Sequence, residues 1–226
     1  LHFRFKKQYK NQIVIKKSKE LPHLMNRNYA LANEVSHSIS ISSITILISL
    51  MYGLNEASVF AVYYLVSQAL SLISSSLYSA FEPSFANLIA SGDDKSAQVI
   101  FQAFQLAFVM FNTLLMSCML YLVTPFAVIY TSNAADIKYE NNLIAVLLVM
   151  IGTMSAYRIP YNMVVSSCGL FKETWKQPVF TVCITFLISV IFGRIRFELI
   201  ILGPVIFYFV NFVYQHFKIN QIREGF

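Results

Sequence analysis

The sequence predicts an all-α integral membrane protein, a bundle of six transmembrane helices. Of the 226 residues, 57% are hydrophobic and only 12% are charged, whereas soluble proteins have about 25% charged residues. Long uncharged stretches recur along the chain, and a membrane-spanning helix needs roughly 20 mostly apolar residues. A soluble enzyme, a nucleic-acid-binding protein and a disordered scaffold all need a charged surface, so these classes are excluded.

The six candidate spans are the uncharged runs between consecutive charges. They are Val35–Asn55, Ala57–Phe81, Ser96–Ala135, Asn141–Tyr157, Gln177–Gly193 and Leu199–Phe217.

Prolines are expected to set the ends of several spans, because proline has no backbone N–H to donate. Pro83 is expected to close the second helix, and Pro125 the third, which leaves 126–135 as a loop. The fourth run is interrupted only by Arg158. Its helix is therefore expected to continue toward Phe171 with a kink at Pro160.

The positive charge is concentrated before the first span. Residues 1–27 carry eight Lys/Arg and one acid, whereas residues 28–226 carry nine Lys/Arg and ten acids. With six spans, 14 Lys/Arg fall on the side that holds both termini and three on the other. The positive-inside rule then predicts a basic cytoplasmic tail (1–27), a six-helix lobe (28–217) and a cytoplasmic C-terminus (218–226). Because the chain starts with Leu1 and no signal peptide is recognisable, we expect it to be a fragment.

The cysteines and the remaining polar residues do not form a metal or catalytic motif. Cys118, Cys168 and Cys183 are scattered, so they are expected to be apolar packing residues and not metal ligands or disulfide partners. No Walker-type loop and no Ser/His/Asp set is found outside the spans. We expect neither an enzyme nor a bound cofactor.

Arg158 is the main candidate for a functional residue within a span. A charge near the centre of a bilayer costs about 2.5–3.5 kcal/mol on insertion scales, so it is retained where it faces a cavity or a partner. One interpretation is a cation in a water-filled cavity, suited to a phosphate or a sugar acid. The other is that the helix stops at Pro160 and Arg158 reaches the cytoplasmic interface.

The first two spans carry further polar candidates. Glu34 and His37 are three residues apart and share one helix face, so they form a possible ion-coupling pair; the alternative is that both are simply hydrated. In the second span, Tyr63 and Gln68 precede a series of serines. Small residues of this kind favour close helix packing over the lining of a lumen. Asn162 places an amide one turn after Arg158, where an interhelix hydrogen bond is the default.

Several motifs, in order, resemble one transporter family. Arg158-Ile159-Pro160-Tyr161-Asn162, followed by Gly169-Leu170-Phe171-Lys172-Glu173-Thr174, is similar to the "R-x-P-x-N … G-x-F-K-x-T" stretch of the Wzx-type oligosaccharide flippases. This is the polysaccharide-transport branch of the multidrug/oligosaccharidyl-lipid/polysaccharide exporter superfamily. Residues 57–63, 83–93 and 124–131 resemble further segments of that family. The resemblance covers most of residues 24–190.

The resemblance implies the C-terminal lobe of a two-lobe transporter. Its cargo would be a polyprenyl-diphosphate-linked oligosaccharide, moved across the cytoplasmic membrane by alternating access for polysaccharide biosynthesis. Substrate-binding residues would be Arg158, Asn162, Tyr63 and Gln68. Its partners would be the lipid-linked glycan, membrane lipids and either a missing N-terminal lobe or a second copy, without nucleic acid.

Three alternatives remain open at this point. A multidrug/cation antiporter of the same superfamily would favour acidic cavity residues. An inactive half-transporter would lack the opposite wall of the cavity. A membrane glycan polymerase or acyltransferase is the least favoured, because the longest external loop is the short segment 125–140.

Overall fold

The computed structural model describes residues 27–92, 94–132 and 138–224, and in these ranges the chain is helical with no strand. Six helices are long and apolar enough to cross a membrane, which confirms the predicted fold class and a multi-pass membrane protein. The predicted basic tail lies almost entirely outside the described residues. The elements are α3 (Arg27–Met51), α4 (Leu54–Ser91), α5 (Asp94–Tyr130), α6 (Asn142–Ser167), α7 (Phe171–Thr174), α8 (Lys176–Phe192), the 3-10 helix η1 (Phe197–Ile201) and α9 (Leu202–Glu224).

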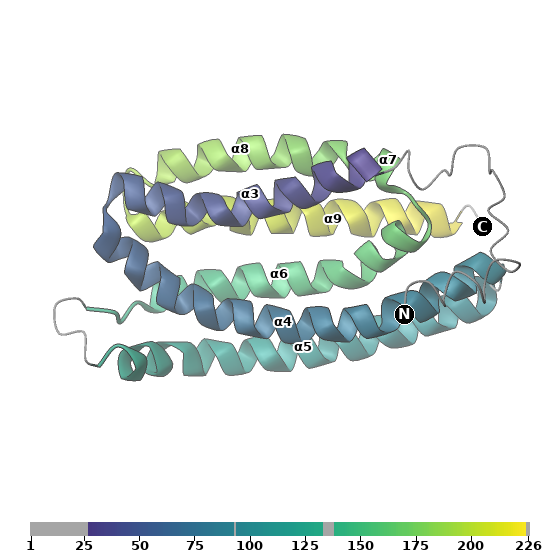
Figure 1. The fold of residues 1–226 in the computed structure, drawn as a ribbon, viewed down its shortest axis with the longest axis horizontal. Coiled ribbons are helices and arrows are strands. Elements are labelled where there is room, and N and C mark those ends of the chain that lie inside the picture. The colour runs from purple at the N-terminus through teal and green to yellow at the C-terminus, as the bar shows by residue number, and fades with distance from the viewer. Residues whose placement is uncertain (1–26, 93, 133–137, 225–226) are drawn as a thin grey trace, which may run out of the picture.

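Helix α6 is the central element of the bundle. It packs against α4, α5 and α9, while α3 packs against α8 and α4. Figure 1 shows α3, α8 and α9 on one side of α6, and α4 and α5 on the other. The start of α3, the short helix α7, the α4–α5 turn and the end of α9 lie at the same end of the bundle. This end is called the α7 end below.

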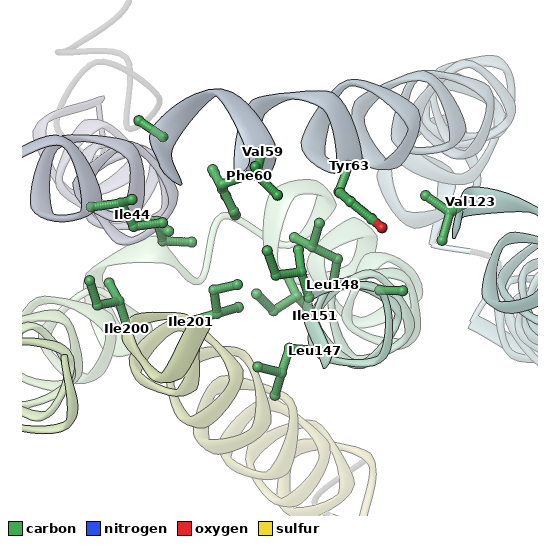
Figure 2. Close-up of a cluster of buried hydrophobic side chains, with 14 of the residues drawn as sticks. Ile44, Val59, Phe60, Tyr63, Val123, Leu147, Leu148, Ile151, Ile200 and Ile201 are labelled. Carbon is green, nitrogen blue, oxygen red and sulfur yellow. The ribbon is translucent and has the colours of Figure 1, made fainter. Parts of the chain in front are cut away.

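The main hydrophobic core joins α3, α4, α6 and η1 toward the other end of the bundle. Large apolar side chains meet there from segments far apart in the sequence (Figure 2). Ile44, Phe60, Leu148, Ile200 and Ile201 are each at most 1% exposed. Their burial stabilises the contact between the η1 turn and the central helix.

Two predicted helix ends are wrong. Helix α4 continues through Pro83 to Ser91, and α5 continues through Pro125 to Tyr130. A proline removes only one hydrogen bond of the ladder, to the carbonyl four residues earlier. Both prolines are exposed, so their rings do not disturb a packed interface. The two helices also pack against each other.

The turn between α4 and α5 is correspondingly much shorter than the predicted loop. Gly92 ends α4 with φ 74°, a left-handed conformation, and its amide donates to the carbonyls of Ile89 and Leu88. With 38 and 37 residues, α4 and α5 are each more than 50 Å long at about 1.5 Å per residue. They therefore exceed the roughly 30 Å hydrocarbon core.

Helix α6 passes through Pro160, as predicted, but ends at Ser167 before the predicted Phe171. The end is a Schellman turn: the amide of Leu170 donates to the carbonyl of Val165, and that of Gly169 to Ser166. Gly169 has φ 67°, which favours glycine. At the other end, the side chain of Asn141 caps α6 by accepting a hydrogen bond from the amide of Ile144.

Candidate functional site

Arg158 is buried inside the bundle, on the central helix. Its side chain is 9% exposed, and its Nε and Nη1 atoms have no hydrogen-bond partner among the described residues. Helix α6 continues nine residues beyond it to Ser167, about 14 Å at 1.5 Å per residue. The interpretation in which the helix stops at Pro160 and frees Arg158 to reach the interface is therefore wrong.

Residues on three other helices lie close enough to Arg158 to interact with its charge. Glu34 and His37 of α3, Tyr78 of α4 and Tyr208 of α9 interact with it electrostatically. Tyr78 donates a hydrogen bond to Glu82. The site thus brings together residues that are widely separated in the sequence.

The two residues of the predicted pair differ in burial: His37 faces the interior of the bundle and Glu34 faces its surface. His37 is buried, and its ring centroid lies 4.9 Å from that of Phe207 and 5.6 Å from that of Tyr208. Both of its ring nitrogens lack a partner in the described structure. Glu34 is exposed. Residues three apart on a helix are neighbours but not superimposed, so one side chain of the pair points inward and the other outward.

A groove of about 410 Å³ adjoins this cluster. Gln68, Ser71 and Ser75 of α4 line it on one side and Ser155 of α6 on the other, together with Tyr208. Leu148 and Ile151 add apolar surface. Tyr208 belongs to both the groove and the surroundings of Arg158, and Ser155 precedes Arg158 by one helical turn, so the two features are adjacent.

The serines of α4 divide between packing and lining. Ser74 is buried and donates a hydrogen bond to the side chain of Asn112 on α5, an interhelix contact of the predicted kind. Ser67, Ser71 and Ser75 instead line the groove. Ser67, Ser71 and Ser75 recur every four residues and so share one helix face, whereas Ser74 is rotated by about 100° from Ser75. Neighbouring serines therefore lie on different surfaces of α4.

The other two predicted substrate-binding residues lie in different places. Asn162 follows Arg158 by one turn of α6, and its buried Oδ1 atom has no partner among the described residues. Tyr63 is fully buried in the main core. Its hydroxyl group donates to the carbonyl of Tyr139 and accepts from the amide of Asn141. Asn162 therefore lies one turn from Arg158, and Gln68 lines the adjacent groove. Tyr63 belongs to neither feature.

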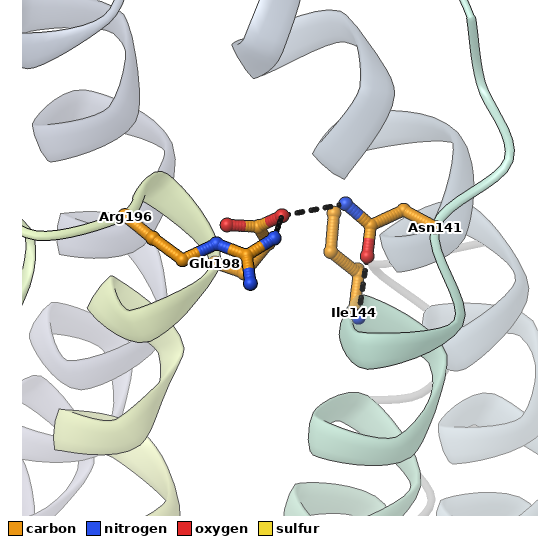
Figure 3. A network of polar contacts seen from close by, with 4 residues as sticks. All are labelled: Asn141, Ile144, Arg196 and Glu198. Carbon is orange, nitrogen blue, oxygen red and sulfur yellow. Dashed lines mark hydrogen bonds and ion pairs between the residues drawn. The ribbon is translucent and has the colours of Figure 1, made fainter.

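A buried carboxylate that the sequence analysis did not single out lies at the end opposite α7. Glu198 is 3% exposed, and its Oε1 atom accepts hydrogen bonds from Asn141 at 3.0 Å and from Arg196 at 3.1 Å (Figure 3). These contacts join the start of α6 to η1. The charged residues Arg196 and Glu198 could have suggested an ion pair from the sequence, but their spacing does not reveal which side chain is buried.

The cysteines are not packing residues of the core. All three are exposed on the helices or turns that carry them, because each lies on a side of its element that no other helix covers. Across the described ranges, no group of three or more His, Cys, Asp or Glu side chains is arranged to hold a metal ion.

The arrangement suits binding of an anion that also carries hydroxyl groups. A guanidinium with unsatisfied donors favours phosphate or carboxylate oxygens. Serine hydroxyls and the Gln68 amide can exchange hydrogen bonds with sugar hydroxyls. No protein-family model, curated protein or solved structure matches the chain.

Proposed function

We propose that the chain is one lobe of a flippase that moves a lipid-linked oligosaccharide across the cytoplasmic membrane for polysaccharide biosynthesis. The observation that supports this most is Arg158, buried without a hydrogen-bond partner for Nε and Nη1 beside a hydroxyl-lined groove. Burial of an unpaired charge is costly. An anionic ligand that accepts hydrogen bonds from Nε and Nη1 would offset that cost when it binds.

The groove supplies complementary chemistry for a polyprenyl-diphosphate-linked glycan. Arg158 and Asn162 would contact the diphosphate, and Gln68 with Ser71 and Ser75 the sugars. The polyprenyl chain would remain in the lipid, because it has no polar group that needs the groove. The protein would thus lower the cost of moving the polar part of the cargo through the hydrocarbon core.

The mechanism would be alternating access between this lobe and a second one. Gln68, Ser71 and Ser75 are exposed on α4, and polar side chains facing lipid are unfavourable. A second lobe, either an N-terminal half or another copy of this chain, would cover that side and form the opposite wall. Rocking of the two lobes about the cargo would then expose the groove to each leaflet in turn.

The charge of the site distinguishes this proposal from a cation antiporter. The residues that line the groove in the described structure include no acid, and the closest buried charge is Arg158. A cation would be repelled by that charge. A glycan polymerase or acyltransferase is less favoured, since the site holds binding groups rather than a nucleophile paired with a base.

The test is translocation in reconstituted vesicles. The chain, alone and together with a candidate N-terminal lobe, would be assayed for movement of a fluorescent polyprenyl-diphosphate oligosaccharide between leaflets, and in parallel for export of a cationic dye. The proposal expects glycolipid movement with the second lobe or as a dimer, and no dye export. Dye export without glycolipid movement would favour the antiporter, and neither activity in any assembly would favour an inactive half.

A further inference from the structure

We propose that the α7 end of the bundle binds the headgroup of an anionic phospholipid, at a site formed by Arg27, Tyr29, Lys172, Trp175 and Lys176. These five residues are called the Trp175 site. The proposal concerns the surface of the bundle and does not depend on which cargo the groove carries.

The fold brings two distant segments together at this site. The Schellman turn at Gly169 redirects the chain from α6 into the four-residue helix α7. Trp175 follows α7 directly, and its ring stacks on that of Tyr29 at the start of α3, with centroids 5.5 Å apart. Helix α7 also contacts α3. The aromatic pair therefore has a defined position between α3 and α8.

Basic residues flank both members of the aromatic pair in the sequence: Arg27 precedes Tyr29 by two residues, and Lys172 and Lys176 lie within three residues of Trp175. Arg27, Lys172 and Lys176 are exposed. The nearby acid Glu173 pairs with Lys218, with 3.6 Å between Nζ and Oε2. Within the described part of the chain, neither Lys172 nor Lys176 forms an ion pair. The site thus has an excess of positive charge that an anionic headgroup can complement.

An exposed apolar stripe begins at the same place. Phe180 and Ile184 follow Lys176 at intervals of four residues on α8, and they are 69% and 59% exposed. On a helix, this spacing places them on one face with Lys176 at its end. A phosphate group next to Lys176 would therefore leave the acyl chains beside Phe180 and Ile184.

The combination of features favours a lipid over a soluble anion. Tryptophan and tyrosine concentrate at the membrane–water interface, where a ring can contact both headgroup and hydrocarbon. Lysine and arginine at that level attract anionic lipids, and basic pockets between spans bind their headgroups. A soluble phosphate would use only the charges, whereas a phospholipid also covers the apolar stripe.

Trp175 provides the measurement, because it is the only tryptophan in the chain. The full chain would be reconstituted into phosphatidylcholine vesicles that contain increasing fractions of brominated phosphatidylglycerol or brominated phosphatidylcholine. Bromine quenches tryptophan emission at close range. We expect phosphatidylglycerol to reach half-maximal quenching at a mole fraction roughly ten-fold lower, on the scale expected for a few basic residues near the surface.

Matched variants separate specific binding from general contact with lipid. Lys172→Gln with Lys176→Gln should remove most of the preference, whereas Lys172→Arg with Lys176→Arg should keep it. Lys138→Gln with Arg194→Gln changes two charges at the opposite end and should leave quenching unaltered. Circular dichroism would verify that each variant is folded.

Three results would overturn the proposal. One is equal quenching by both brominated lipids in the unmodified chain. Another is an unchanged preference in the double glutamine variant. The last is displacement of brominated phosphatidylglycerol by inorganic phosphate at constant ionic strength, which would assign the site to a soluble anion.

Discussion

The hydroxyl oxygen of Tyr63 on α4 accepts a hydrogen bond of 2.8 Å from the backbone amide of Asn141, which caps α6. The same hydroxyl group donates to the carbonyl of Tyr139 at 3.0 Å. One side chain therefore satisfies two backbone groups of the segment that enters the central helix. The side-chain amide of Asn141 in turn donates a hydrogen bond to Glu198, so these hydrogen bonds connect α4, the start of α6 and η1.

Replacement of Tyr63 by phenylalanine should destabilise the bundle. The variant keeps the ring but leaves an amide and a carbonyl without their partner, at a cost of about 1–3 kcal/mol. Thermal unfolding in mild detergent should show a lower midpoint. Tyr121→Phe is the matched control, because Tyr121 is 78% exposed. Equal midpoints for both variants would show that the Tyr63 hydroxyl contributes nothing to stability.

Replacement of Arg158 by methionine should leave the stability unchanged or raise it. The guanidinium is buried with unpaired donors, and exchange of a poorly compensated buried charge for an apolar side chain of similar length is often neutral or stabilising. Residues kept for function commonly have this property. Arg194→Met is a suitable control, because Arg194 is exposed.

The measurement for this prediction is the midpoint of thermal unfolding in the absence of cargo. A large decrease for Arg158→Met alone would mean that the arginine stabilises the bundle through its electrostatic interactions with Glu34, Tyr78 and Tyr208. That result would remove the energetic reason for assigning Arg158 to a binding site.

Replacement of Gly203 by alanine should separate α8 from α9. An added Cβ atom would lie 2.0 Å from the Ser189 hydroxyl oxygen and 2.4 Å from the Thr185 carbonyl oxygen. Backbone atoms cannot move aside without a shift of the helix, and overpacking of this kind costs about 1–3 kcal/mol. Unfolding midpoints should fall for Gly203→Ala but hardly change for Ile206→Ala on the more exposed face. An unchanged midpoint for Gly203→Ala would contradict the close packing.

The α7 end should face the cytoplasm. Arg27, Lys172, Lys176 and Lys218 belong to this end, whereas Lys138, Arg194 and Arg196 belong to the opposite one; the positive-inside rule places the more basic end inside. With the native cysteines replaced, single cysteines at Asn55 and Ser132 should react with an impermeant maleimide on intact cells. Cysteines at Ser91 and Lys172 should react only after lysis. Labelling at Lys172 in intact cells would reverse the orientation.

The sequence predicted the six spans because insertion into a membrane depends mainly on composition over about 20 residues. The ends of the helices were harder to predict. Pro83 and Pro125 are strong local signals for a helix end, but both rings are exposed and α4 and α5, which pack against each other, continue through them. The cost of a proline within a helix can be estimated from the sequence, whereas the exposure of its ring and the packing of neighbouring helices cannot.

Site residues could be predicted only where a residue differs in polarity from the apolar run that contains it. Arg158 was recognised because a charge interrupts an apolar run. Tyr208 and Ser155 were not, since their types are common in spans and their role depends on which helix faces meet. Tyr63 was named for its type, yet the structure surrounds it with core residues. The rotation of each helix about its axis is decided by tertiary packing.

The most direct test of the central claim is glycolipid translocation by the complete two-lobe assembly with Arg158→Ala. Two charge-assisted hydrogen bonds to the cargo, at about 1.5–3 kcal/mol each, correspond to a loss of at least about 100-fold in rate. The amount of protein in the membrane should be unchanged, and Arg158→Lys should restore part of the activity because it keeps the charge but not the planar donors. Translocation by the alanine variant at the rate of the unmodified protein would contradict the assignment of Arg158 to cargo binding.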